Sequence, residues 1–289
     1  MKLIDMCHGH KEVPMFICDV SPPRGPEMKS LNRVRDMDAD LVCVAYNPGK
    51  SVRADSTMLA AVIKNYCGNE VIFTIATRDM NRLAIQSSIL GAQLLGLDNV
   101  VVVGGDPFDD TDLTLLNEPN GFTSTGLIRS LFRMNNGLDY SGRPLDKATD
   151  LCIGASIDLG KAMVNEVDLT IRKVNAGAEF FITQPVFDVD DIDKFCQSYA
   201  NISGSMPKEP IFWGVQILVE DGICFSEVPD QLMVELEKGR AGIDIALKII
   251  EQFRGRGINR FYLIPPINKG GKRDYESAKA VLELAGVQD

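Results

Sequence analysis

The chain has 289 residues, of which 45% are hydrophobic and 24% charged, a composition that supports a large packed core. Its formal net charge of −10 argues against binding to nucleic acid or to an anionic membrane surface, since both need a basic face. The sequence has no apolar run long enough to span a bilayer and no signal-peptide pattern at its start, so we expect a cytoplasmic protein.

The first ten residues bring together a thiol and both histidines of the chain, Cys7, His8 and His10. Metal binding is one interpretation of this cluster. A fourth ligand is missing, however, and we expect a mobile terminus without a metal site. The seven cysteines are scattered singly, without a CxxC pair, which indicates reduced thiols that are mostly small core residues.

Eight short runs of apolar and β-branched residues follow one another along the chain. They are almost continuously apolar, which is typical of parallel strands that are buried on both faces. The runs cover residues 15–20, 41–46, 71–76, 99–105, 151–156, 178–184, 210–216 and 260–265.

Helical segments are expected between these runs. Two of them carry apolar stripes at helical spacing: Met163, Val167, Ile171 and Val174, and Ile243, Leu247, Ile250 and Phe253. Asp188, followed three residues later by Asp191, predicts a helix start with an acidic capping box, and Pro229 suits the first turn of another helix. Eight strand–helix units without a linker predict an α/β fold, a single (β/α)₈ TIM barrel covering residues 1–289 as one domain. Two smaller α/β lobes are the alternative.

A barrel of this kind places its active site at the carboxyl ends of the strands. The residues there are Asp19, Tyr46 with Asn47, Thr74 to Arg78, Asp106, Ser156 with Asp158, Gln184, Gln216, and Pro265 with Pro266. Neither histidine is among them, so a Ser-His-Asp or Cys-His nucleophile is excluded as the chemistry of this site. Acids and amides around a mouth that a planar ligand can approach favour redox chemistry on a bound cofactor.

The acid that ends the first predicted strand lies in the stretch CDVSPPRG, residues 18–25. The two prolines stop strand pairing and make a stiff turn, which holds the Asp19 carboxylate still. Two interpretations stay open. Asp19 caps the turn or pairs with Arg24, or it is a general acid whose pKa is raised by an apolar site.

Three further segments have both a functional and an ordinary interpretation. The GGDP turn at residues 104–107 allows a flat or phosphate-bearing ligand to approach the backbone, although it is not a dinucleotide fingerprint. Residues 77–82 begin a helix that could receive an anion or is simply capped. The glycine-rich basic loop 267–273 follows the last strand, where barrels often bind phosphate. Arg172 and Lys173 fall late on a helix, where cations are favourable in any protein.

Three motifs together resemble the methylenetetrahydrofolate reductase family over nearly the whole chain. They are DVSPPRG, TRDMNRLAIQSSILGAQLLGLDNVVVVGGDP and IRKVNAGAEFFITQPVFD. With NNGLDYSGRPL and YLIPP, the chain looks most like the reductase half of bifunctional homocysteine S-methyltransferase/methylenetetrahydrofolate reductases.

The resemblance implies a barrel in which NADH or NADPH reduces FAD and methylenetetrahydrofolate is converted to methyltetrahydrofolate, or the reverse, in one-carbon metabolism and methionine biosynthesis. Asp19 then corresponds to the general acid, and Asp106 lies beside the flavin and the pterin with an electrostatic role. Gln184 binds pterin or nicotinamide, and Gln216 or a residue in VEDGI, residues 219–223, stands where the family has a folate-binding glutamine after the seventh strand. The positions that match flavin contacts are Tyr46, Thr74, Gly105, Glu166, Arg172 and Lys173, the last two towards the pyrophosphate and adenosine.

The sequence also departs from the family pattern. Asp19 stands where glutamate is usual, Thr74 where many members have histidine, Gly104 where many have arginine, and Pro266 where an arginine is often found. These changes suggest a subgroup of the family.

Three hypotheses follow. The first is the reductase, with a tetrahydrofolate or related pterin as its small-molecule substrate and no metal. The second is a flavin-binding paralogue or electron-transfer subunit with another substrate, and the third is a flavin-free pterin-binding methyl-transfer partner. A homo-oligomer or a partner subunit is compatible with all three.

Overall fold

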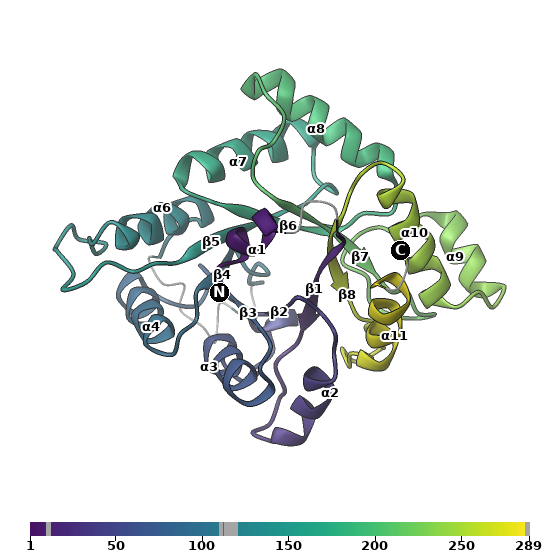
Figure 1. Cartoon of the computed structure of the whole chain (residues 1–289), viewed down its shortest axis with the longest axis horizontal. Helices are drawn as coiled ribbons and strands as arrows, with labels where there is room; N and C mark the ends of the chain where they lie inside the picture. The colour runs from purple at the N-terminus through teal and green to yellow at the C-terminus, as the bar shows by residue number, and fades with distance from the viewer. Residues whose placement is uncertain (10–12, 110–111, 113–120, 287–289) are drawn as a thin grey trace.

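The computed structural model describes residues 1–9, 13–109, 112 and 121–286, and in it eight parallel strands close into one barrel (Figure 1). The strands are hydrogen-bonded in chain order from β1 to β8, and β8 pairs with β1. The single (β/α)₈ barrel is therefore confirmed, and the alternative of two lobes is wrong. The strands are β1 Met15–Val20, β2 Leu41–Val44, β3 Val71–Ala76, β4 Asn99–Val103, β5 Cys152–Ile157, β6 Phe180–Pro185, β7 Ile211–Gln216 and β8 Arg260–Ile264.

The strands agree with the apolar runs of the sequence to within two residues at either end. Every residue of β1, β3 and β7 is buried, because one face of each strand fills the barrel interior and the other is covered by helices. Residues 45–46 and 104–105, which the sequence assigned to strands, lie in the loops above the barrel. The runs were therefore longer than the hydrogen-bonded ladders.

The helices form the outer ring (Figure 1). They are α1 Leu3–Gly9, α2 Asn32–Arg35, α3 Ser56–Val62, α4 Arg82–Leu94, α6 Ser124–Asn135, α7 Met163–Ala176, α8 Val189–Ser203, α9 Asp230–Glu237, α10 Gly242–Arg254 and α11 Tyr275–Gly286. Short 3-10 turns cover Met28–Leu31 and Pro48–Lys50, and a π-helical turn covers Ile63–Cys67. None of the helices in the described ranges is long and apolar enough to cross a membrane.

The predicted helix stripes and caps are largely present. On α7, Val167 is fully buried, and on α10 so is Phe253, while Ile243 is only partly covered. Asp188 caps α8 by accepting a hydrogen bond from the Asp190 amide. Pro229 is the N-cap of α9, one position before the first turn in which it was expected, because the helix begins at Asp230.

The helix α1 closes the amino-terminal end of the barrel, so the prediction of a mobile terminus is wrong for residues 3–9. Leu3 and Cys7 are buried in the cluster that fills the barrel interior. Asn99 at the start of β4 accepts a hydrogen bond from the Leu3 amide at 2.7 Å. Burial raises the pKa of the Cys7 thiol, as expected for a core cysteine, and all seven cysteines are free thiols.

The metal interpretation of this segment gains no support. Within the described residues, no group of three or more His, Cys, Asp or Glu side chains is arranged to hold a metal ion. His8 is exposed, and His10 lies outside the described residues.

Candidate functional site

A cavity of about 460 Å³ opens at the carboxyl ends of the strands, where the sequence placed the site. Its volume is in the range of small-ligand sites. Most of the predicted site residues line it, together with residues that the sequence did not single out. The lining residues are Asp19, Ala45, Tyr46, Pro48, Gly49, Thr74, Val103, Gly104, Gly105, Asp106, Pro107, Ser156, Asp158, Lys161, Ile182, Thr183, Gln184, Phe225, Tyr262 and Arg273. We call this the ring cavity.

Asp19 lies at the end of β1 and is 2% exposed. The Tyr262 hydroxyl donates a hydrogen bond to its Oδ1 at 2.8 Å, and Arg273 Nη2 lies 2.7 Å from its Oδ2. The carboxylate is thus part of a buried ion pair, and its partner is Arg273, not Arg24 as one interpretation held. The carboxyl group therefore lies in a buried polar cluster of Tyr262 and Arg273.

Tyr262 and Arg273 are the two partners of Asp19, and the sequence predicted neither of these contacts. Burial and the neighbouring Asp19 charge raise the pKa of the Tyr262 hydroxyl well above its usual value, so it stays a donor. A signal for Tyr262 was available, because it pairs in register with Ile17 of β1, whose side chain fills the barrel. Tyr262 therefore also faces the barrel interior, where its hydroxyl contacts the Asp19 carboxyl.

Arg273 belongs to the glycine-rich loop for which the sequence predicted phosphate or carboxylate binding. It binds the carboxylate of the chain itself. Its Nε also donates to Ser21 Oγ at 3.0 Å, and its guanidinium lies 5.3 Å from the centre of the Phe225 ring. These contacts bring the loop after β8 onto the turn after β1.

The GGDP turn forms one wall of the ring cavity. Gly105 has φ of +86°, and a Cβ there would lie 3.1 Å from the Arg78 Cβ, so the position requires glycine. Asp106 accepts a hydrogen bond from the Gly49 amide at 3.1 Å, and its carbonyl accepts one from Arg78. The absence of a side chain at Gly105 leaves backbone exposed to a flat ligand.

The segment at residues 77–82 forms a capped helix start. Asn81 caps α4 by accepting from the Ala84 amide, and Arg78 pairs with the adjacent Asp79. Tyr46 lines the cavity nearby, and burial with the Asp79 charge raises the pKa of its hydroxyl. The ordinary interpretation of this helix start accounts for its contacts.

Thr74 is buried and Gln184 half-buried, and both line the ring cavity. Gln216, in contrast, does not line it. The Gln216 amide donates to the Ile223 carbonyl at 2.6 Å and its oxygen accepts from the Phe225 amide at 3.2 Å. Gln216 therefore holds the loop that places the Phe225 ring on the cavity wall.

Arg172 and Lys173 also do not line the cavity. Arg172 is exposed and pairs with Asp168 one helical turn away, at 2.9 Å. Lys173 is buried, donates to the Ser156 carbonyl and lies 3.9 Å from Glu166, which itself accepts from the Asp158 amide. Lys173 thus joins α7 to β5, and none of Arg172, Lys173 and Glu166 lines the ring cavity.

Burial lowers the pKa of Lys173 to about 8, with the Glu166 charge opposing the shift. Between this value and the ordinary 10.5, the unfolded chain binds more protons than the folded one, so stability rises with pH. We expect the free energy of unfolding of the wild type, minus that of a Glu166→Gln/Lys173→Met variant, to increase from pH 8 to 10.5. Urea titrations at half-unit steps measure this difference, from which the other titrating groups cancel. A flat or falling difference would contradict the lowered pKa.

The donor set of the ring cavity fits a planar heterocycle better than it fits a whole dinucleotide. Glycine backbone lies on one wall, with Gln184 and Asp106 as polar partners. Among the described residues, the cations on the lining are Lys161 and Arg273, and Arg273 is already paired with Asp19. The lining therefore suits a planar ring, and its second cation, Lys161, lies 3.6 Å from Asp158.

Comparisons with known proteins agree with the barrel. The sequence model of the methylenetetrahydrofolate reductase family matches residues 6–270. Methylenetetrahydrofolate reductase (NADH) 1 of Arabidopsis thaliana is 21% identical over 286 residues, which cover 91% of this chain and 48% of the plant protein. The chain thus spans about half the length of this curated relative.

A solved structure of an uncharacterised Clostridium thermocellum protein is similar in fold, with a TM-score of 0.64 and 15% identity. The similarity covers 99% of this chain and 100% of that one, and that protein binds two copies of 5-methyl-5,6,7,8-tetrahydrofolic acid. At this identity the likeness concerns the fold. The family model, however, matches most of the sequence, and the chain therefore belongs to the methylenetetrahydrofolate reductase family.

Proposed function

We propose that this chain is a flavin-dependent oxidoreductase that interconverts 5,10-methylenetetrahydrofolate and 5-methyltetrahydrofolate. The observation that supports it most is the ring cavity, which gathers Asp19, Asp106 and Gln184 at the barrel mouth of a chain belonging to this family. The Clostridium thermocellum protein of similar fold, which binds a methylated tetrahydrofolate, favours a folate as the substrate.

FAD is the proposed cofactor, and when bound it supplies reversible hydride transfer between a nicotinamide and the folate. Tyr46, Thr74, Gly105 and Asp106 would hold its ring, since all four line the ring cavity. Glu166, Arg172 and Lys173 would act towards its phosphate end only after turning from their present partners. NADH is the first reductant to test, because the Arabidopsis relative is named as an NADH enzyme.

For the folate, Gln184 and Asp106 would bind the pterin, as donor and acceptor on the cavity wall. Gln216 would act through the loop it holds, placing the Phe225 ring against the substrate. Asp19 is the proposed proton donor to the ring-opening nitrogen. This role requires Asp19 to take up a proton although Arg273 lies beside it, and Tyr262 keeps the carboxyl in place.

A second function is favoured by one observation, that Arg172 and Lys173 do not face the cavity. It is a pterin-binding protein without flavin, which serves methyl transfer as a partner of another enzyme. The ring cavity would then hold the pterin alone.

The purified chain distinguishes these functions. We expect it to bind FAD with the absorbance of a protein-bound flavin, and anaerobic mixing of the photoreduced protein with methylenetetrahydrofolate to reoxidise the flavin. A chain that gains no flavin absorbance but retains tetrahydrofolate in equilibrium dialysis would instead have the second function. A flavin that binds and stays reduced after mixing would rule out the folate as the oxidant and indicate another substrate.

A further inference from the structure

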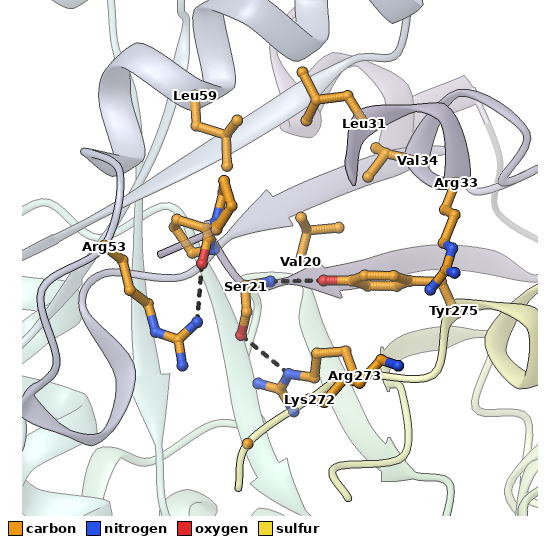
Figure 2. A pocket seen from close by; sticks show the side chains of 13 residues that line it. Val20, Ser21, Leu31, Arg33, Val34, Arg53, Leu59, Lys272, Arg273 and Tyr275 are labelled. Atoms are coloured by element: carbon orange, nitrogen blue, oxygen red, sulfur yellow. Dashed lines mark hydrogen bonds between the residues drawn. The ribbon is translucent and has the colours of Figure 1, made fainter. Parts of the chain in front are cut away.

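A second cavity, of about 350 Å³, lies beside the ring cavity, between the turn after β1 and the loop after β8 (Figure 2). Its walls are partly apolar, with Leu31, Val34 and Leu59 on one side. Its charged lining residues are Arg33, Arg53, Lys272 and Arg273, and we call it the cationic pocket. It includes Lys272 and Arg273 of the loop that the sequence suggested for phosphate binding, and the proposed function gives this pocket no ligand.

The lining of the cationic pocket contains four cations and no carboxylate. This is unexpected in a chain with a net charge of −10. Within the described part of the chain, Arg33, Arg53 and Lys272 form no ion pair with a carboxylate. A surface that gathers like charges without compensation repels itself, unless an anion neutralises it.

Arg53 shows this repulsion most directly. Its guanidinium donates to the Pro22 carbonyl at 3.0 Å and to Ser51 Oγ at 3.1 Å, and both acceptors are neutral (Figure 2 shows the first bond). Burial, with the neighbouring charges of Arg24 and Arg273, lowers the pKa of Arg53. The hydrogen bonds fix the side chain in position, while its charge stays uncompensated.

Arg273 adds a second, independent observation. The residue is 6% exposed, and its Nη1 is buried without a hydrogen-bond partner in the described structure. A buried donor without an acceptor costs about 1–3 kcal/mol, and such groups are rare. Asp19 Oδ2 also has no hydrogen bond within the described structure, so an anion in the pocket would supply Nη1 with the acceptor that the ion pair does not. Arg273 lines both the cationic pocket and the ring cavity, and the two therefore meet at this side chain.

We propose that the cationic pocket is an oxyanion subsite for the charged arm of the ligand whose ring occupies the ring cavity. The arm is a flexible chain with two or more carboxylate or phosphate groups, because arginine guanidinium groups match both geometries. Leu31, Val34 and Leu59 form the uncharged wall beside the arm. The proposal rests on the proposed function for the ring, and two arms have this chemistry: the glutamate tail of a folate and the phosphates of a dinucleotide.

The first test measures anion binding without any turnover, so that it stands apart from the proposed function. Isothermal titration with inorganic tripolyphosphate is expected to show saturable binding to the wild-type chain. We expect the affinity to fall about tenfold or more in Arg53→Gln, and similarly in Arg33→Gln/Lys272→Gln. The double variant is safe for folding, since both side chains are exposed and have no hydrogen bond within the described residues. Lys194→Gln, an exposed cation on α8, is the matched control and should bind as the wild type does.

The second test identifies the arm. Equilibrium dialysis compares 5-methyltetrahydrofolate carrying one or three glutamates, and NADH with NADPH, on the wild type and Arg53→Gln. If Arg53→Gln loses a preference of the wild type for three glutamates over one, the pocket binds the folate tail. If only the affinity for the dinucleotides falls, the pocket binds their phosphates. Tripolyphosphate binding that is absent, or equal in all variants, would overturn the subsite. Weaker tripolyphosphate binding without an effect on either ligand would overturn its assignment to a ligand arm.

Discussion

Asp19→Asn is expected to slow the reoxidation of the reduced enzyme by methylenetetrahydrofolate by at least about 100-fold, while reduction by NADH or NADPH proceeds as before. The carboxyl group is the proposed proton donor, and general acid catalysis contributes about 10²–10⁴-fold. An amide cannot supply the proton, although it has nearly the same shape. Anaerobic stopped-flow absorbance measures each half-reaction separately.

Asp19→Asn also leaves the buried Arg273 without its ionic partner, so a loss of rate has to be separated from a misplaced side chain. Tyr262→Phe is the matched control. It removes the 2.8 Å hydrogen bond that positions the Asp19 carboxyl group but leaves that group itself in place. We expect this variant to retain the folate half-reaction within about tenfold. An unchanged rate in Asp19→Asn would refute the proton-donor role, and equal losses in both variants would show that positioning is what matters.

Arg273→Met is expected to lower the free energy of unfolding by about 3–5 kcal/mol. The Asp19 and Arg273 side chains are 3% and 4% exposed, so removal of the cation leaves a carboxylate in the interior, with the Tyr262 hydroxyl as its one remaining partner among the described residues. In a domain of this size the loss corresponds to a fall in Tm of about 10 °C. Urea unfolding and calorimetry measure both quantities.

The double variant Asp19→Asn/Arg273→Met shows whether the unpaired charge causes this loss. It contains neither charge, and we expect it to recover at least about half of the stability that Arg273→Met loses. If the two substitutions instead add, the ion pair has no energetic role and Arg273 stabilises the fold through its other contacts, with Ser21 and Phe225.

The barrel could be predicted because its signal is local. Continuous apolar runs between amphipathic segments are sufficient to indicate buried parallel strands, and the strand ends then name the residues of the mouth. Asp19, Tyr46, Thr74, Asp106 and Gln184 were located in this way, and all five line the ring cavity.

The sequence did not reveal the contacts between segments that lie far apart in the chain. Asp19 and Arg273 are at opposite ends of the chain, and nothing near Asp19 indicates that its partner is beyond Arg24. The sequence also does not show in which direction a long side chain points. The position of Lys173 on its helix fits either a ligand contact or a buried bond to Ser156, and the structure has the second.

The amino-terminal helix was missed for a related reason. Residues 3–9 are too few to form a stable helix alone, and a short segment with two histidines has little helical signal. Its stability comes from the barrel interior, where Leu3 and Cys7 pack. Only the closed barrel supplies that surface.

The position of Arg273 between the two cavities makes them thermodynamically coupled. The Asp19 carboxylate and the proposed ligand arm are two anions that compete for one guanidinium. An arm that binds Arg273 would weaken the contact between Arg273 and Asp19, and by reciprocity a weaker contact with Asp19 would strengthen the binding of the arm. Occupation of the cationic pocket would in this way change how firmly the Asp19 side chain is held in the ring cavity.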